Sequence, residues 1–147
     1  MKPTLRPGAT RVNRIAIGRE RTIGFMGEEA RTYATPSMIL DIEHTCRELI
    51  IAHADAGEDS VGMEVAVKHL APTLMGMTVE VSVRVTAVDG RKVAFEVSVK
   101  DELDAVGTGT HTRFVVDKAK TLERLKAKAA RFAAQSGDTH GERRPPE

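Results

Sequence analysis

The sequence has few aromatic side chains, one cysteine and almost no net charge. Among its 147 residues there is no tryptophan, one tyrosine and four phenylalanines, so aromatic groups can build little of a core or a binding site. The single cysteine, Cys46, excludes an intramolecular disulfide and is typical of a reducing compartment, so we expect a cytoplasmic protein. A formal net charge of +1 gives no field that would indicate binding to nucleic acid or to an anionic membrane.

The chain also lacks the segments that mark membrane and exported proteins. No apolar run approaches the roughly 20 residues that a membrane-spanning helix needs. The basic N-terminal residues are not followed by the apolar stretch of a signal peptide. With 41% hydrophobic residues the chain can fill one core. We therefore expect one domain over residues 13–134, between a loose basic arm (residues 1–12) and a disordered tail (residues 135–147).

No pattern indicates a metal site or a phosphate-binding loop. No Gly-rich loop follows a predicted strand. The histidines do not show, with acidic residues, the spacing of metal ligands; they are His44, His53, His69, His111 and His140. We expect no metal and no cofactor other than one carried by a substrate.

One long helix is predicted in the first half of the chain. Thr35-Pro36 is a typical helix start, with threonine as N-cap and proline at the first helical position. We expect the helix to run from Pro36 to about Ala54, ahead of a polar stretch that contains Gly57. Glu43 falls at the edge of its apolar stripe. The residues with the 3.6-residue period are Ile39, Ile42, Cys46, Leu49, Ile50 and His53.

The residues after this helix alternate between apolar and polar. Strands are predicted over residues 60–70, 77–88, 92–100 and 105–116, and Asp89-Gly90 is a strong hairpin signal. The alternation indicates an antiparallel sheet with one face in water. A weaker alternation over residues 14–25 suggests another strand, and residues 118–134 predict a lysine-rich amphipathic helix.

This order of elements predicts an α+β fold in which an antiparallel sheet wraps around a long central helix. It is the order found in hot-dog domains, here with an extra C-terminal helix. A lone sheet of this kind has exposed edges, which are available for pairing with another chain. We therefore expect a homodimer, or a dimer of dimers, formed through a continued sheet.

Two ionisable residues occupy positions that should be apolar. Glu43 lies beside the helix stripe, and His69 ends a strand whose alternate residues are Val61, Met63, Val65 and Val67. Burying a carboxylate or an imidazole there is costly unless each finds a partner. We expect Glu43 and His69 to partner each other around a bound molecule.

Three segments together resemble the fluoroacetyl-CoA thioesterase group of hot-dog hydrolases. They are YAT-x-x-M-x-x-x-x-E beginning at Tyr33, G-x-x-x-x-x-x-H beginning at Gly62, and GTGTHTR ending at Arg113. The resemblance covers about residues 33–116, most of the predicted fold.

The resemblance implies a catalytic set of Thr35, Glu43 and His69, with Gly62 and Arg113 at the substrate. Thioester hydrolysis needs a base that deprotonates water or a nucleophile that forms a mixed anhydride, and the carboxylate of Glu43 can serve as either. His69 would orient the attacking group and protonate the departing CoA thiolate.

Each of these residues also has a structural interpretation. Thr35 is an N-cap, His69 a core histidine, and Gly62 a glycine that relieves crowding between strand and helix. Glu43 is an ordinary surface glutamate in the same interpretation. Arg113 is a cross-strand partner of an acidic residue or a ligand of a CoA phosphate or the active-site loop; the acidic candidates are Glu80, Glu96 and Asp101. We interpret His111 as structural, and Cys46 as a core residue because no basic neighbour favours its thiolate.

The stretch before the threonine departs from the family. The resemblance implies a phenylalanine-rich lid there that selects fluoroacetate, whereas residues 24–31 read GFMGEEAR and supply only Phe25. We predict a thioesterase for a small acyl-CoA, with CoA present only as part of the substrate. The alternatives are a non-catalytic acyl-CoA-binding hot-dog protein and a hot-dog hydratase or dehydratase. The second of these usually has an aspartate beside its histidine, which Lys68-His69-Leu70 lacks.

Overall fold

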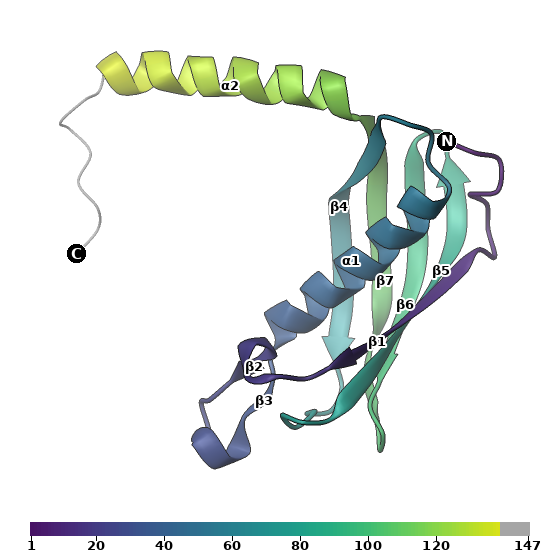
Figure 1. Cartoon of the computed structure of the whole chain (residues 1–147), viewed down its shortest axis with the longest axis vertical. Helices are drawn as coiled ribbons and strands as arrows, with labels where there is room; N and C mark the ends of the chain where they lie inside the picture. The colour runs from purple at the N-terminus through teal and green to yellow at the C-terminus, as the bar shows by residue number, and fades with distance from the viewer. Residues whose placement is uncertain (139–147) are drawn as a thin grey trace.

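The computed structural model describes residues 1–138 as a curved antiparallel sheet around one helix (Figure 1). The main sheet consists of β1 (Thr10–Ala16), β4 (Glu58–His69), β5 (Thr78–Asp89), β6 (Lys92–Lys100) and β7 (Ala105–Asp117). The helices are α1 (Thr35–Ala52) and α2 (Lys118–Asp138). The predicted α+β hot-dog architecture, with its extra C-terminal helix, is confirmed.

The strand order in the main sheet is β1-β5-β6-β7-β4. Each neighbouring pair is antiparallel, and β5 and β6 form the hairpin predicted from Asp89-Gly90, with Gly90 at φ +60°. The four strands predicted after the helix are all present. β1 and β4 are therefore the two edges of the sheet, and no described strand pairs with their outer backbone groups.

The core lies between α1 and the concave face of the sheet. The buried residues of α1 include Met38, Ile42, Cys46, Leu49 and Ile50. They face the alternating apolar residues of the central strands, which are Val79, Val81, Val83, Val85, Val93, Phe95, Val97 and Val99. Each fully buried side chain of this size stabilises the fold by roughly 1.5–3 kcal/mol. Cys46 is a core residue, as predicted.

The N-terminal segment is bound to the rest of the chain rather than loose. The backbone N–H of Lys2 donates to the carbonyl of His53 over 2.8 Å, and that of Gly8 donates to Val85 over 2.9 Å. Leu5 belongs to the core, with 4% of its surface exposed. No sequence pattern indicated that this segment is attached, because one leucine among basic residues and prolines has no periodicity.

Thr35 does not cap α1, so that interpretation is wrong. Ala34 occupies the N-cap position and makes no side-chain capping bond, while Thr35 is the first helical residue and Pro36 the second. The hydroxyl of Thr35 points instead to His69, its hydrogen-bond partner. The position of Thr35 at the helix start was predicted. Its hydrogen-bond partner was not, because that partner depends on where β4 ends.

Strand β4 contains a bulge at Met63, between Gly62 and Glu64. Before the bulge Val61 pairs with Phe114, and after it Val65 pairs with His111. Paired residues share a face of the sheet, so Val61 lies on the opposite face from Val65 and His69. The single apolar face predicted for this strand is therefore interrupted.

Two further segments complete the described chain. A small sheet of β2 (Thr22–Ile23) and β3 (Thr32–Tyr33), with the short 3-10 helices η1 (Arg19–Arg21) and η2 (Glu28–Ala30), lies at the N-terminal end of α1 (Figure 1). Helix α2 leaves the end of β7 and extends past the β4 edge. It reaches Asp138, so part of the predicted tail is helical, and residues 139–147 lie outside the described residues. No helix in the described part is long and apolar enough to cross a membrane.

Candidate active site

Thr35 and His69 form a hydrogen-bonded pair at the start of α1. Thr35 Oγ1 lies 2.7 Å from His69 Nδ1. Thr35 is the first residue of α1 and His69 is the last residue of β4, so the pair joins helix to sheet. Burial lowers the pKa of His69, against a smaller opposing effect of the Ala71 backbone, which favours a neutral ring near pH 7. A neutral imidazole with its proton on Nε2 can accept the Thr35 hydroxyl proton at Nδ1.

An open cleft of about 330 Å³ adjoins this pair. Its lining comes from β2, β3, the start of α1 and the segment after β4, and consists of Ile23, Thr32, Tyr33, Thr35, His69, Leu70, Ala71 and Pro72. The positive end of the α1 dipole also lies at this cleft, because Thr35 begins the helix. The cleft can therefore receive a group that develops negative charge.

A buried polar cluster holds the backbone next to Thr35. The hydroxyl of Tyr33 donates to Asp41 Oδ2 over 2.6 Å, and Arg21 Nε donates to the same oxygen over 3.2 Å. The Tyr33 ring also lies edge-on to the His69 ring, with 6.3 Å between centroids. Burial, followed by the Asp41 hydrogen bond, raises the pKa of Tyr33, so its hydroxyl keeps the proton that it donates. Tyr33 thus touches both the helix start and the imidazole.

Glu43 lies farther along α1, where it faces Gly62 of β4. A Cβ atom on Gly62 would come 3.0 Å from Glu43 Oε1, with His111 and Arg113 the next nearest side chains. Within the described residues the Glu43 carboxylate makes no hydrogen bond or ion pair. It is a carboxylate at the sheet edge whose oxygens are free to bind another group.

Arg113 is buried behind Gly62 and bound to Ser60 and His111. Its Nε donates to Ser60 Oγ over 2.8 Å, its Nη2 donates to the Ser60 carbonyl over 2.9 Å, and its Nη1 lies 3.2 Å from His111 Nε2. Only 5% of Arg113 is exposed, so in one chain its guanidinium does not reach a phosphate in solvent. None of the acidic cross-strand partners predicted for it is in contact with it.

The hydrogen bonds around His111 define its protonation state. Its Nδ1 lies 2.8 Å from the carbonyl oxygen of Glu64, which can only accept, so Nδ1 carries a proton. Its Nε2 then accepts from Arg113. Burial lowers the pKa of His111, and the Arg113 cation lowers it further against the effect of the Glu64 carbonyl. Burial also lowers the pKa of Arg113, while Glu43 opposes that shift and is the carboxylate that acts most on this cation.

The predicted site residues therefore form two groups within one chain. One contains Thr35 and His69, and the other contains Glu43, Gly62 and Arg113. Thr35 and Glu43 are eight residues apart on α1, or about 12 Å along the axis. Gly62 and His69 are seven residues apart on β4, or roughly 23 Å. The expected contact between Glu43 and His69 is not made within a single chain.

Sequence reasoning missed Ser60 and the Tyr33–Asp41 contact, and gave His111 no role beside Arg113. His111 and Arg113 are two residues apart on one strand, which places them on one face and was the available signal. Tyr33 and Asp41 belong to different elements, a strand and a helix, so no periodic pattern in the sequence linked them. Among the described residues there is no group of three or more histidine, cysteine, aspartate and glutamate residues that could hold a metal ion.

Comparison with solved structures defines the class. A Thermus thermophilus protein, described as a thioesterase superfamily member, superposes with a TM-score of 0.83 at 30% identity, over 91% of this chain and 99% of its own. A phenylalanine-to-alanine variant of a fluoroacetyl-CoA-specific thioesterase, solved with fluoroacetate and CoA, gives a TM-score of 0.72 at 28% identity, over 79% and 98%. The fold is that of a hot-dog thioesterase.

Comparison of sequences defines the family within that class. Residues 17–119 match the model of the fluoroacetyl-CoA-specific thioesterase family. The fluoroacetyl-CoA thioesterase of Streptantibioticus cattleyicolor is 30% identical over an alignment 135 residues long, which covers 87% of this chain and 94% of that enzyme. This chain belongs to the fluoroacetyl-CoA-specific thioesterase family and is a thioester hydrolase, as the sequence motifs predicted.

Proposed function

We propose that this thioesterase hydrolyses a small acyl-CoA to the carboxylic acid and free CoA, without a metal or a separate cofactor. The observation that carries the proposal is the Thr35–His69 hydrogen bond at the N-terminus of α1, beside an open cleft. The thioester oxygen gains negative charge when its carbonyl carbon is attacked, and a helix N-terminus stabilises such charge. The family to which the chain belongs is named for a two-carbon acyl group, which favours a short acyl chain here as well.

The missing carboxylate would come from a second copy of the chain. Strand β4 is an edge of the sheet, and its side chains Val61, Met63 and Val65 are exposed. A bare apolar edge of 12 residues is a template for pairing, and an isologous dimer would pair the two β4 strands antiparallel. This supports the homodimer expected from the sequence.

One register of that pairing completes the site. If Gly62 lies opposite His69 of the second copy, the two-fold axis passes between Val65 and Ala66. Paired strands are about 4.8 Å apart, so Glu43, which faces Gly62, would then lie near the Thr35–His69 pair of the other copy. Each dimer would have two such sites, one at each end of the paired strands.

The chemistry assigned to this composite site follows from the side chains. Glu43 takes a proton from water, or its carboxylate attacks the carbonyl carbon and forms a mixed anhydride that water then opens. Either way the C–S bond breaks and CoA leaves as a thiolate. His69 orients the attacking group and relays to the thiolate the proton released by water, while the Thr35 hydroxyl holds the ring at Nδ1 and the N-terminus of α1 binds the carbonyl oxygen. Gly62 leaves space for the acyl group beside Glu43, and Arg113 supports that space through Ser60 and His111.

A panel of acyl-CoAs tests the proposed substrate class. Each CoA ester is incubated with the protein, and released thiol is measured with a chromogenic thiol reagent. The panel contains acetyl, fluoroacetyl, branched, aromatic and long-chain esters. The proposal predicts the highest kcat/KM for short acyl groups. Faster hydrolysis of long or aromatic esters would contradict it, and binding without thiol release would indicate the non-catalytic alternative.

Mixing two inactive variants tests the composite site. Glu43→Gln and His69→Ala are each purified and then mixed under conditions that exchange subunits. If a site takes Glu43 and His69 from different copies, each mixed dimer has one intact site, and an equal mixture recovers about a quarter of the parent's activity. If both residues act within one copy, no intact site forms and no activity returns.

A further inference from the structure

Helix α2 has an apolar stripe that no other described residue covers. The stripe consists of Leu122, Leu125, Ala129 and Phe132, which recur at three- and four-residue intervals. Every residue from Leu122 to Gln135 is exposed, and Phe132 and Leu125 each have 59% of their surface in contact with solvent. An amphipathic helix about 30 Å long gains most of its stability by packing such a stripe against another surface.

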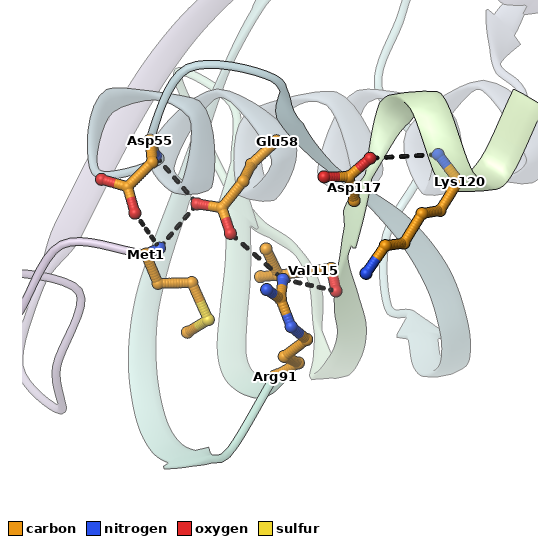
Figure 2. Close-up of polar contacts among 7 residues, drawn as sticks. All are labelled: Met1, Asp55, Glu58, Arg91, Val115, Asp117 and Lys120. Atoms are coloured by element: carbon orange, nitrogen blue, oxygen red, sulfur yellow. Dashed lines mark hydrogen bonds and ion pairs between the residues drawn. The ribbon is translucent and has the colours of Figure 1, made fainter.

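The start of α2 is fixed in direction (Figure 2). The side chain of Asp117 accepts from the backbone N–H of Lys120 over 3.0 Å and so caps the helix, and the Lys118 N–H donates to the Gly57 carbonyl over 2.8 Å. Beside it, Arg91 links Glu58 of β4 to the Val115 carbonyl of β7. The helix is therefore held relative to the sheet at its first turn.

From this junction α2 extends past the β4 edge of the sheet (Figure 1). Glu58 pairs with Asp117, so α2 begins at the end of β4 that is far from His69. In an antiparallel pair of β4 strands, the Glu58 end of one copy lies beside the His69 end of the other. The residues after His69 in the second copy are thus the nearest surface for α2.

That surface is also apolar. In the segment from Leu70 to Met77, the side chains of Leu70, Leu74 and Met75 are exposed. Its first residues line the cleft beside Thr35 and His69. We propose that the α2 stripe packs on residues 70–77 of a second copy of this chain, beside the mouth of that copy's cleft. This inference rests on the β4-paired dimer of the proposed function.

Cysteine cross-linking tests this contact directly. Leu125→Cys and Leu74→Cys are introduced into one chain, and the protein is treated with a short bis-maleimide. The natural thiol does not interfere, because Cys46 is buried and its pKa is raised to about 12. Position 125, on α2, lies beyond the Glu58 end of β4, and position 74 lies beyond its His69 end. Because β4 is roughly 36 Å long, a short reagent cannot link the two positions within one chain. We expect covalent dimers.

Two control variants test whether cross-linking is specific to positions 125 and 74. Leu125→Cys with Val12→Cys places the second thiol on β1, the far edge of the sheet, and should give no covalent dimer. Leu125→Cys alone should give none either; dimers formed by this single variant would show α2 pairing with α2 and overturn the proposal. Failure of 125–74 cross-linking in an active, dimeric protein would overturn the proposal and leave the thioesterase assignment intact. A protein that is monomeric by light scattering would contradict both.

A second measurement does not depend on introduced thiols. Phe132→Ser should raise the dimer dissociation constant by about tenfold or more, whereas Arg131→Ser, on the basic side of α2 away from the stripe, should leave it within about twofold. The competing occupant is an anionic lipid surface, because α2 also carries several lysines and arginines. Sedimentation of the parent with phosphatidylserine vesicles, lost in Phe132→Ser while the dimer is unchanged, would overturn the proposal.

Discussion

At the residue scale, the carboxylate of Glu43 is the group on which turnover should depend most. Replacing it in Glu43→Gln keeps the size of the side chain and removes its proton-accepting and nucleophilic oxygen. We expect turnover of the best acyl-CoA to fall by about 10²–10⁴-fold, with little change in the melting temperature because the carboxylate has no bonded partner among residues 1–138. Steady-state kinetics and thermal unfolding measure both effects.

Glu48 on the same helix provides a matched control. It is bonded to Arg11 and Asn13 on the side of α1 away from the site, and Arg11 and Asn13 lower its pKa. Glu48→Gln should leave turnover unchanged and reduce stability slightly. The double variant Glu43→Gln/His69→Ala should lose no more activity than the worse single variant, since the residues act as one unit. Parental turnover in Glu43→Gln would refute the mechanism.

Because Thr35 is not an N-cap, its substitution separates activity from stability. Thr35→Ala should lower turnover without the roughly 1 kcal/mol loss that removing a cap causes, since no capping bond is present. Thr35→Ser, which keeps the hydroxyl near His69 Nδ1, should retain most of the activity. A large drop in melting temperature for Thr35→Ala with normal turnover would show that the hydroxyl is only structural.

The lowered pKa of His69 sets the acid side of the pH profile. Its folded-state pKa lies below the ordinary value of 6.5 because burial disfavours the cation. Activity that needs the neutral ring should therefore be complete above pH 6.5 and decline as the pH falls below it, and His69→Gln should remove this limb. The same burial makes protonation destabilising, so the stability from the neutral ring is lost as pH falls through the lowered pKa. Rate profiles and melts between pH 4 and 8 test both parts.

At the scale of elements, two glycines in the β4–β7 region should respond differently to alanine. In Gly62→Ala the new methyl meets the flexible end of Glu43 at 3.0 Å, which can move. In Gly109→Ala it meets the Ala66 carbonyl oxygen at 2.1 Å and the Val67 Cα at 2.8 Å, which are backbone atoms that cannot. We expect the first variant to fold and lose turnover, and the second to be strongly destabilised. Circular dichroism melts and kinetics distinguish them.

The junction of β4, β7 and α2 should be sensitive to acid. The hydrogen bonds of Glu58 to the Met1 amino group, the Asp55 backbone and Arg91 lower its pKa to about 2 (Figure 2). A carboxyl with a depressed pKa stabilises the fold fully above its unfolded value near 4.5, and this stabilisation is lost as pH falls toward 2. Glu58→Gln should therefore lower the melting temperature at pH 7 and make little difference near pH 2. An equal effect at both pH values would contradict this origin.

Element positions were predictable because their periods are strong. The strands from Glu58 onward and helix α1 have clear two- and 3.6-residue patterns, and Asp89-Gly90 marks its hairpin. The short β2–β3 sheet was not predicted, because two-residue strands are held by contacts such as the Tyr33 N–H to the Thr73 carbonyl, which no local pattern encodes. The bulge at Met63 was missed for the same reason, since it is a property of the pairing between β4 and β7.

The site was only partly predictable at this scale. The motifs placed Thr35 and His69 at the ends of a helix and a strand that do meet. The distance between Glu43 and His69 depends on which residue of β4 lies beside Glu43, and the sequence alone does not give that residue. The burial of Arg113 depends on Ser60, a residue with no distinguishing pattern of its own.

At the scale of the whole molecule, the two edges of one sheet should behave differently. Val65 on β4 and Val12 on β1 are both exposed edge residues. Val65→Lys should convert a dimer into a monomer of 16.0 kDa and abolish activity, because edge lysines block strand pairing. Val12→Lys should change neither mass nor activity. Light scattering with parallel kinetics tests this, and an active monomeric Val65→Lys variant would disprove the composite site.

The buried position of Cys46 has a consequence for an enzyme that produces a thiol. Each turnover of an acyl-CoA releases the CoA sulfhydryl beside the protein, where an accessible cysteine could be trapped as a mixed disulfide by thiol–disulfide exchange. The only sulfhydryl of this chain is in the core, and burial raises its pKa to about 12, so almost no thiolate is present. The thioesterase is thereby insulated from the redox chemistry of its own product, and its activity should be the same in oxidised and reduced glutathione buffers.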